Sequence, residues 1–160
     1  MSDPDHSLVA IYIAENKQSP MQSVASANAI AGEGLQGDRY LVSPKHSGPD
    51  REITLIESES IESVPIEFDL PLELGESRRN LVTRGVRLND LVGKTFQVGE
   101  VVLKGHRLCH PCSHLQKMTR PGILKALVNR GGLRAEILVG GTIAIGDLIC
   151  LKTPSEAAHA

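Results

Sequence analysis

Short apolar runs, separated by glycine, proline and polar residues, recur along the whole chain. Runs of four to eight residues rich in valine, isoleucine and leucine are typical of strands rather than of helices. Glycine after many of these runs supplies tight turns between them. The pattern predicts strands at residues 8–13, 52–56, 81–83, 96–98, 101–103, 134–139, 142–145 and 148–151.

Helix signals are fewer. Residues 121–129 have proline in the first turn, apolar residues at helical spacing and glycine beyond the end, which predicts a helix. Residues 58–64 predict a shorter helix that Ser58 caps and Pro65 ends. Residues 25–31 fit either a helical turn or a strand. The sequence thus predicts a mainly β fold with a few helices, a β-rich α+β class, closed as a barrel.

Length and composition narrow the function. The chain has 160 residues, a net charge of -2, 2% aromatic residues and no tryptophan. Stacking on single-stranded nucleic acid needs aromatic platforms, and non-specific binding to nucleic acid or membranes needs basic runs. We therefore expect no nucleic-acid partner and no membrane contact. We expect one domain over residues 1–160, with its core at about 8–151.

Cysteine usage gives an expected compartment. Three cysteines cannot all pair within one chain, so free thiols in a reducing cytoplasm are the simplest interpretation. The first residues lack the pattern of a signal peptide, and no apolar run approaches the ~20 residues of a membrane span. A cytoplasmic protein is therefore expected.

Residues 107–115 hold two of the three cysteines and two of the six histidines. Cys109 and Cys112 form a C-x-x-C pair, but zinc would need about two further ligands. A thioredoxin-like pair would need a βαβ unit, which the β-rich pattern does not offer. Buried structural cysteines, a nucleophilic thiolate and a ligand to a soft metal stay open. The roles of His106, His110 and His114 stay open as well.

Residues 32–37 match G-x-G-x-x-G, the fingerprint of dinucleotide sites, which requires a helix directly afterwards. Pro44 and Pro49 forbid a long helix there. We therefore favour a glycine turn that lets the backbone approach a ligand closely, with Asp38 and Arg39 just beyond it.

Two further polar segments are candidates for binding an anion. Arg78 and Arg79 stand before a predicted strand, either on a solvated face or as a clamp for phosphate. Neighbours on a regular strand face opposite ways, so only one of them would then point inward. Gly131 and Gly132 follow a predicted helix and either cap it or expose backbone amides beside Arg134.

Several of these pieces occur together in one order. They lie at residues 34–39, 78–86, 88–94, 111–112, 130–135 and 146–147. In this order and spacing the chain resembles a MOSC domain, the module named after the C-terminal part of molybdenum-cofactor sulfurases. The resemblance runs from about residue 9 to residue 151 and is to the short stand-alone bacterial members.

The resemblance implies a MOSC-type β-barrel that binds the molybdenum cofactor, molybdopterin. It implies that Cys112 is the catalytic cysteine, either a molybdenum ligand or a persulfide carrier, with Cys109 as a candidate second ligand. It also implies molybdenum ion binding and pyridoxal phosphate binding at the level of the family. The implied cofactor-binding residues are Gly37, Asp38, Arg39, Arg78, Arg79, Asn80, Gly131, Gly132 and Arg134.

Three functions follow as hypotheses. The first is an oxidoreductase that reduces N-hydroxylated or N-oxide compounds with electrons from a reductase partner. The second is a carrier of persulfide sulfur, or of the cofactor, that works with a sulfur donor or an acceptor protein. The third is a zinc-stapled interaction module. For the first two we expect Cys112 to share one cleft with Arg78, Arg79, Asn80 and Arg134.

Overall fold

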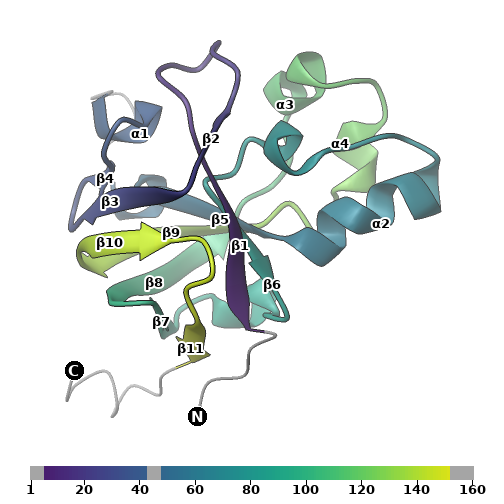
Figure 1. Ribbon diagram of the computed structural model, residues 1–160. Helices are drawn as coiled ribbons and strands as arrows, with labels where there is room; N and C mark the ends of the chain where they lie inside the picture. Colours follow the sequence, from purple (N-terminus) through teal and green to yellow (C-terminus); the bar gives the residue numbers. More distant parts are fainter. Residues whose placement is uncertain (1–5, 43–47, 152–160) are drawn as a thin grey trace.

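The structure is a computed structural model that describes residues 6–42 and 48–151 (Figure 1). The strands are β1 (Ser7–Ile13), β2 (Gln22–Val24), β3 (Ser26–Ile30), β4 (Gly34–Leu35), β5 (Ile53–Glu57), β6 (Leu81–Arg84), β7 (Thr95–Val98), β8 (Val101–Leu108), β9 (Leu133–Val139), β10 (Gly141–Ala144) and β11 (Ile149–Leu151). The helices are α1 (Arg39–Val42), α2 (Ser58–Phe68), α3 (Ser113–Met118) and α4 (Ile123–Ala126), with 3-10 turns η2 (Pro49–Arg51), η3 (Leu74–Ser77) and η4 (Leu88–Leu91).

Most strands join one sheet. In the described residues an eight-stranded sheet has the order β11-β7-β8-β9-β5-β6-β1-β2. Strands β5 and β6 run parallel, and α2 connects them. The sequence pattern did not predict this βαβ unit, because parallel pairing between distant strands leaves no local signal. The cysteines at 109 and 112 lie outside it, between β8 and α3.

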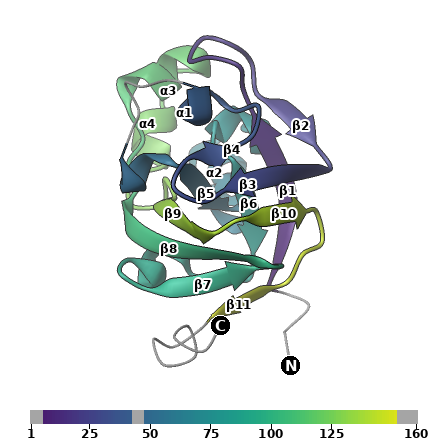
Figure 2. The same cartoon turned by 90° about the vertical axis from the view of Figure 1, so that its left-hand side faces the viewer.

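A second sheet has three strands in the order β10-β3-β4. It resolves the ambiguity at residues 25–31, where β3 forms a strand that pairs with β10. Figure 2 shows β3 and β10 side by side, with β8 and β7 below them. The two sheets are not closed into a barrel in the described residues, so the mainly β class is confirmed and the barrel is not.

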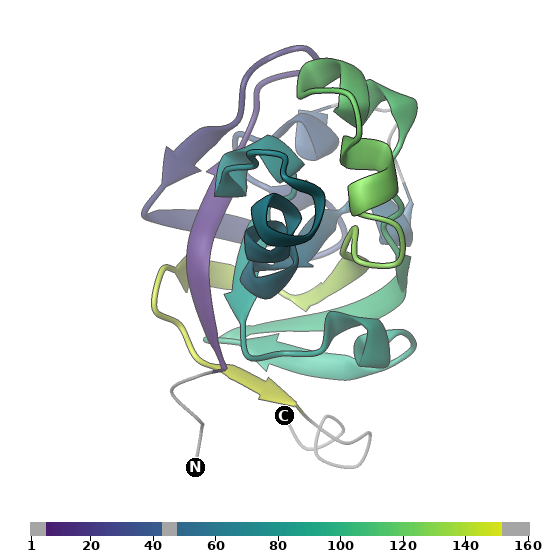
Figure 3. The ribbon, with the colours of Figure 1, turned by 90° about the vertical axis from the view of Figure 1, so that its right-hand side faces the viewer.

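The large sheet is buried on both faces. One face packs against the small sheet, and its cluster includes Leu55 of β5 and Leu81 of β6. The other face carries Ile56 and Val82, which pack with residues of α2, α3 and α4. Figure 3 shows these helices together on one side of the molecule. Burial on both faces explains why Leu55 and Ile56, which are neighbours in β5, are both apolar and both buried.

The predicted helices needed correction. Helix α2 does not end at Pro65 but continues to Phe68, because Ile61 and Val64 anchor it in the core. Asp69, in the left-handed conformation, ends it. The helix predicted at 121–129 is only the short α4, which starts after the left-handed Gly122. Helix α3 was not predicted at all.

The fold brings distant segments to one end of the molecule. The loop between β1 and β2, helix α1 and helix α3 all lie at the top of Figure 1, whereas β7 and β11 lie at the bottom. No helix in residues 6–42 and 48–151 is long and apolar enough to cross a membrane.

A close backbone contact of β8 gives a test of this fold. A Cβ on Gly105 of β8 would overlap the carbonyl oxygen of Leu91, whereas one on Gly146 would meet nothing within 4 Å. Gly105→Ala should lower the free energy of unfolding by about 3 kcal/mol or more. Gly146→Ala should cost only about 1–2 kcal/mol, from its left-handed backbone. Urea denaturation measures both, and equal costs would contradict the close approach of η4 to β8.

Candidate functional site

The segment between β8 and α3 presents its two cysteines differently. Cys109 is buried, and its N–H donates to the carbonyl oxygen of Gly132 at 2.7 Å. Cys112 is exposed, with extended backbone at the N-terminal boundary of α3. The pairing of β8 with β9 ends at Leu108, and the loop that carries both cysteines follows. Of these two thiols, only that of Cys112 is therefore open to a ligand from solution.

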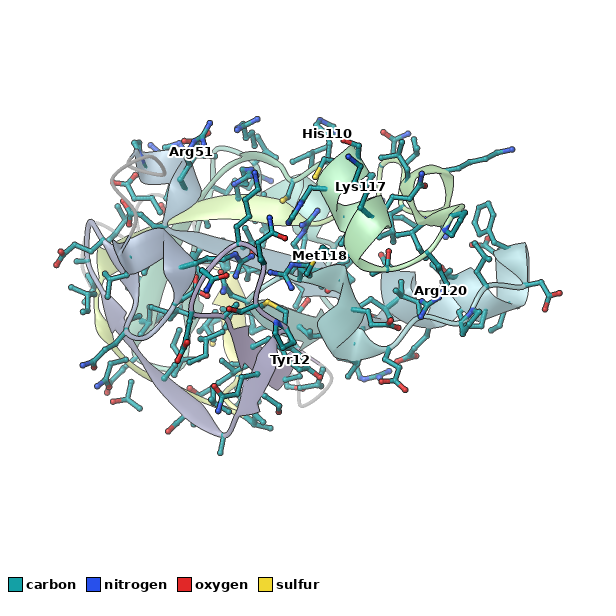
Figure 4. The ribbon with its side chains drawn as sticks, turned by 90° about the horizontal axis from the view of Figure 1, so that it is seen from above. Tyr12, Arg51, His110, Lys117, Met118 and Arg120 are labelled. Atoms are coloured by element: carbon teal, nitrogen blue, oxygen red, sulfur yellow. The ribbon has the colours of Figure 1, made fainter. Side chains whose placement is uncertain are left out.

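A cavity of about 230 Å³ opens beside Cys112. Figure 4 views this end of the molecule from above and labels His110 and Arg51. The described lining of the cavity contains six lysine and arginine side chains and two histidines, but no carboxylate. The protein as a whole carries a net charge of -2, so the positive charge of this cavity is local. The lining residues are Lys17, Arg39, Arg51, Arg78, Arg79, His110, Cys112, His114, Leu115 and Arg134.

Both adjacent arginines line the cavity, although neighbours on a regular strand would face opposite ways. The reason is that β6 begins only at Leu81, and Arg78 has a left-handed backbone with φ of 60°. A non-glycine residue in this conformation costs energy and is found where the surrounding structure enforces it. The expectation that one arginine points outward was conditional on a strand, and that condition fails.

Arg78 fixes one wall of the cavity. Its guanidinium donates to the carbonyl oxygens of Ser19 at 2.7 Å and of Lys17 at 3.0 Å. The Nε2 atom of His114 lies 3.1 Å from the same Lys17 oxygen. Arg39 in turn donates to the carbonyl oxygen of Arg78 at 3.0 Å. The loop between β1 and β2 is thus held over the cavity by Arg78 and His114, which come from two other segments.

Arg79 fixes the opposite wall. Its Nε donates to the carbonyl oxygen of Gly131 at 2.8 Å, and its NH2 group contacts the carbonyls of Cys109 and His110 at 3.4 Å each. Only 7% of Arg79 is exposed. Its donors therefore serve backbone oxygens, and the bonds to Gly131 and Cys109 are buried. The position of the cysteine loop depends on this side chain.

The other cations that line the cavity are available to bind a ligand. In the part of the chain that the structure describes, the side-chain nitrogens of Lys17, Arg51 and Arg134 make no hydrogen bond or ion pair. Nearby Asp50 is bound instead by Arg107 at 2.7 Å, and this hydrogen bond lowers the pKa of Asp50. The charge of Arg51 also acts on Asp50, whereas Lys17 and Arg134 have no partner in the described residues. Cations in such a concave site are well suited to bind phosphate or carboxylate oxygens.

Several other predicted site residues lie outside the cavity lining. Asn80 is buried, where its Oδ1 accepts hydrogen bonds from the N–H and hydroxyl of Thr54 and its amide donates to Tyr12. Asp38 is buried and accepts from the N–H of Ala14 at 3.0 Å. Gly37 is an exposed left-handed turn residue. Any role of these three in holding a ligand stays a prediction.

The glycine pair has a packing role. A Cβ on Gly131 would overlap the carbonyl oxygen of Cys109, and a Cβ on Gly132 would overlap that of Leu55. Both glycines are buried, so they do not present backbone amides to solvent. They let the cysteine loop lie directly against the start of β9, and in this way they place Arg134 beside Cys112.

Sequence reasoning missed two cationic residues. Lys17 lies in an ordinary polar loop and Arg51 in η2, and neither belongs to a motif. Only the folded chain brings them to Cys112. His110 and His114 line the cavity, but His106 does not, because its Nε2 pairs with Glu136 at 2.7 Å.

A second cavity, of about 410 Å³, adjoins the first through Arg78. Tyr12 and Met118, both labelled in Figure 4, line it together with Met21 and Glu73. Burial, and secondly the charge of Glu73, raise the pKa of the Tyr12 hydroxyl. This cavity is less basic than the first.

Fold and site together define a class, a β-rich domain with an exposed thiol in a strongly cationic cavity. The family model of the MOSC domain matches residues 43–149. The chain therefore belongs to the MOSC domain family. No curated protein matches the chain.

Solved structures agree with the fold. The YUAD protein from Bacillus subtilis is 16% identical, with a TM-score of 0.74 and coverage of 90% of this chain and 93% of that one. YiiM from Geobacillus stearothermophilus is 19% identical, with a TM-score of 0.74 and coverage of 92% and 75%. YiiM from Escherichia coli is 19% identical, with a TM-score of 0.67 and coverage of 92% and 70%. At these identities the likeness establishes the fold alone.

The two kinds of arginine predict different responses to mutation. Arg79→Gln should lower the free energy of unfolding by about 2–3 kcal/mol, because it removes a charged donor from buried carbonyls. Arg134→Gln should change it by no more than about 0.5 kcal/mol, since this guanidinium has no partner in the described residues. Urea denaturation measures both. Similar losses in the two variants would show that Arg79 does not hold the cysteine loop.

Proposed function

We propose that this MOSC domain protein binds the molybdenum cofactor in the cationic cavity, with Cys112 as a ligand to the metal. One observation carries the proposal: an exposed thiol and two cations without partners in the described residues, Lys17 and Arg134, line the same cavity of about 230 Å³. Molybdenum held by dithiolene sulfurs is soft, and thiolate is a fitting protein ligand for it.

The residues present fit such a group. Its phosphate requires cationic donors, and Arg51, Arg134 and Lys17 have unused ones in the described structure. A volume of about 230 Å³ lies below the usual range of roughly 300–1,000 Å³ for a whole ligand, so the cavity suits the charged part of a larger molecule. The other eight predicted cofactor-binding residues would act mainly by shaping this cavity. Pyridoxal phosphate binding stays a prediction at the level of the family.

In this proposal the protein itself holds the cofactor and orients it. Arg79 fixes the loop that carries Cys112, and Arg78 fixes the loop that carries Lys17. His110 and His114 also line the cavity, and imidazoles exchange protons near neutral pH. The cofactor, when bound, would supply the two-electron redox chemistry.

The reaction we propose is reduction of an N-hydroxylated or N-oxide compound. Breaking the N–O bond of a hydroxylamine consumes two electrons and two protons and yields an amine and water. Histidines beside Cys112 are suitable proton carriers for this step. The electrons would come from a separate reductase, because the sequence has no flavin, haem or iron–sulfur motif.

A carrier function is the second candidate. The exposure of Cys112 favours it, since a persulfide must be reachable by a donor and an acceptor protein. The zinc hypothesis lacks comparable support. In residues 6–42 and 48–151 no group of three histidine, cysteine or acidic side chains could hold a metal ion, and Cys109 is buried while Cys112 is exposed.

Substitution of each cysteine tests the proposal. In protein from a host that makes the cofactor, Cys112→Ser should abolish retention of molybdenum, because serine is a harder and less readily ionised ligand. Cys109→Ser should weaken retention only partly, and Cys150→Ser is the matched control. Elemental analysis and fluorescence of the oxidised pterin measure the bound cofactor, and melting temperature checks the fold.

The outcomes separate the hypotheses. Molybdenum and pterin in the wild type but not in Cys112→Ser support cofactor binding. Sulfane sulfur on Cys112 without molybdenum, detected by mass spectrometry, supports the sulfur carrier instead. Bound zinc, with equal loss of melting temperature in the variants at 109 and 112, would overturn both. Reduction of an N-hydroxylated compound by the loaded protein with a chemical electron donor tests the reaction itself.

A further inference from the structure

A cavity of about 770 Å³ lies at the end of the molecule where β7 and β11 are found, away from α3 (Figure 1). Its volume is within the range of about 300–1,000 Å³ that is usual for small-molecule sites. The described lining residues are His6, Gly85, Val86, Arg87, Asp90, Leu91, Gly93, Lys94, Thr95, Lys104 and Leu151. None of them belongs to the cavity beside Cys112.

The walls of this cavity are largely apolar. Val86 and Leu91 belong to the core cluster of the large sheet, so they form a rigid wall. Leu151 of β11, which is 53% exposed, adds an apolar side chain to the lining. Gly93 adds no side chain, and a Cβ there would meet nothing within 4 Å. The space between these residues is therefore open to an apolar group.

Positive charge stands beside the apolar walls. Lys104 is opposite Thr95 in the β7–β8 pair, so it lies close to Lys94. Neither lysine side chain makes a hydrogen bond or ion pair in the described residues. Arg87 pairs with Asp90, the only acidic residue of the described lining, at 3.4 Å. Glu136 lies opposite Lys104 in the β8–β9 pair, but its carboxylate is bound by His106 at 2.7 Å. Neither lysine therefore has an ion pair within the described residues.

We propose that this cavity binds a small organic anion with an apolar body, of the aromatic carboxylate class. The apolar walls favour burial of a ring, and the two ammonium groups favour a carboxylate at one end. A bare inorganic anion would leave the apolar walls unused. A cationic ligand would meet two lysines of like charge. The inference is independent of the function proposed for the Cys112 cavity.

Naphthalene-2-carboxylate is the probe for this site. Titrated into the full chain, it should bind with a dissociation constant of about 1 mM or below, the level expected for a ligand of this size. Backbone amide shifts in NMR spectra should change at Gly85, Gly93 and Thr95. The double variant Lys94→Gln/Lys104→Gln should bind at least about tenfold more weakly, since a charge-assisted hydrogen bond is lost.

Two controls make the result specific. Lys125→Gln removes one exposed lysine from α4 and should leave the affinity unchanged. Naphthalene-2-carboxamide, which has no charge, should bind at least about tenfold more weakly than the carboxylate. Melting temperatures of all variants should match that of the wild type.

Three results would overturn the proposal. One is no saturable binding of the carboxylate. Another is equal affinity for the carboxamide, or for the double lysine variant. The third is a set of amide shifts centred on Cys112 and Gly131, which would place the probe in the other cationic cavity.

Discussion

A single buried guanidinium, that of Arg79, sets the geometry on which the candidate site depends. It lies just before β6 and donates to carbonyl oxygens of Gly131, Cys109 and His110. Because those segments are distant in sequence, the cysteine loop has no local reason to adopt this position. The missing side chains of Gly131 and Gly132 allow the close approach, and Arg79 satisfies the carbonyls that the approach buries.

Among the cations of the cavity, some build the walls and others face the ligand space. Arg39, Arg78 and Arg79 are at most 8% exposed and bind backbone oxygens or Asp38, so they build the walls. Lys17 and Arg134 make no such contacts in the described residues and face the cavity. A wall of bonded arginines keeps the other cations close together despite their repulsion. The resulting field is local, in a protein whose net charge is negative.

The sequence predicted the features that have local causes. The residues of β5 are typical of a strand, so this element was predicted. The density of cysteine and histidine at residues 107–115 indicated a candidate site. The left-handed backbone of Arg78 has no signal in the local sequence, because tertiary contacts enforce it. The parallel β5–β6 pair and the closeness of Arg51 to Cys112 also arise only from the three-dimensional fold. Pro65 misled the prediction, since core packing of α2 outweighs its local effect.

The cavity beside Cys112 is assembled from the β1–β2 loop, α1, η2, the segment before β6, the β8–α3 loop, α3 and β9. An unfolded chain cannot bring these segments together, so an anion bound there stabilises the native state alone. At a concentration one hundred times the dissociation constant, such an anion adds about 2.7 kcal/mol to the free energy of unfolding. Scarcity of the ligand would then shorten the lifetime of the protein in a cell, because more of it would be open to proteases at any moment.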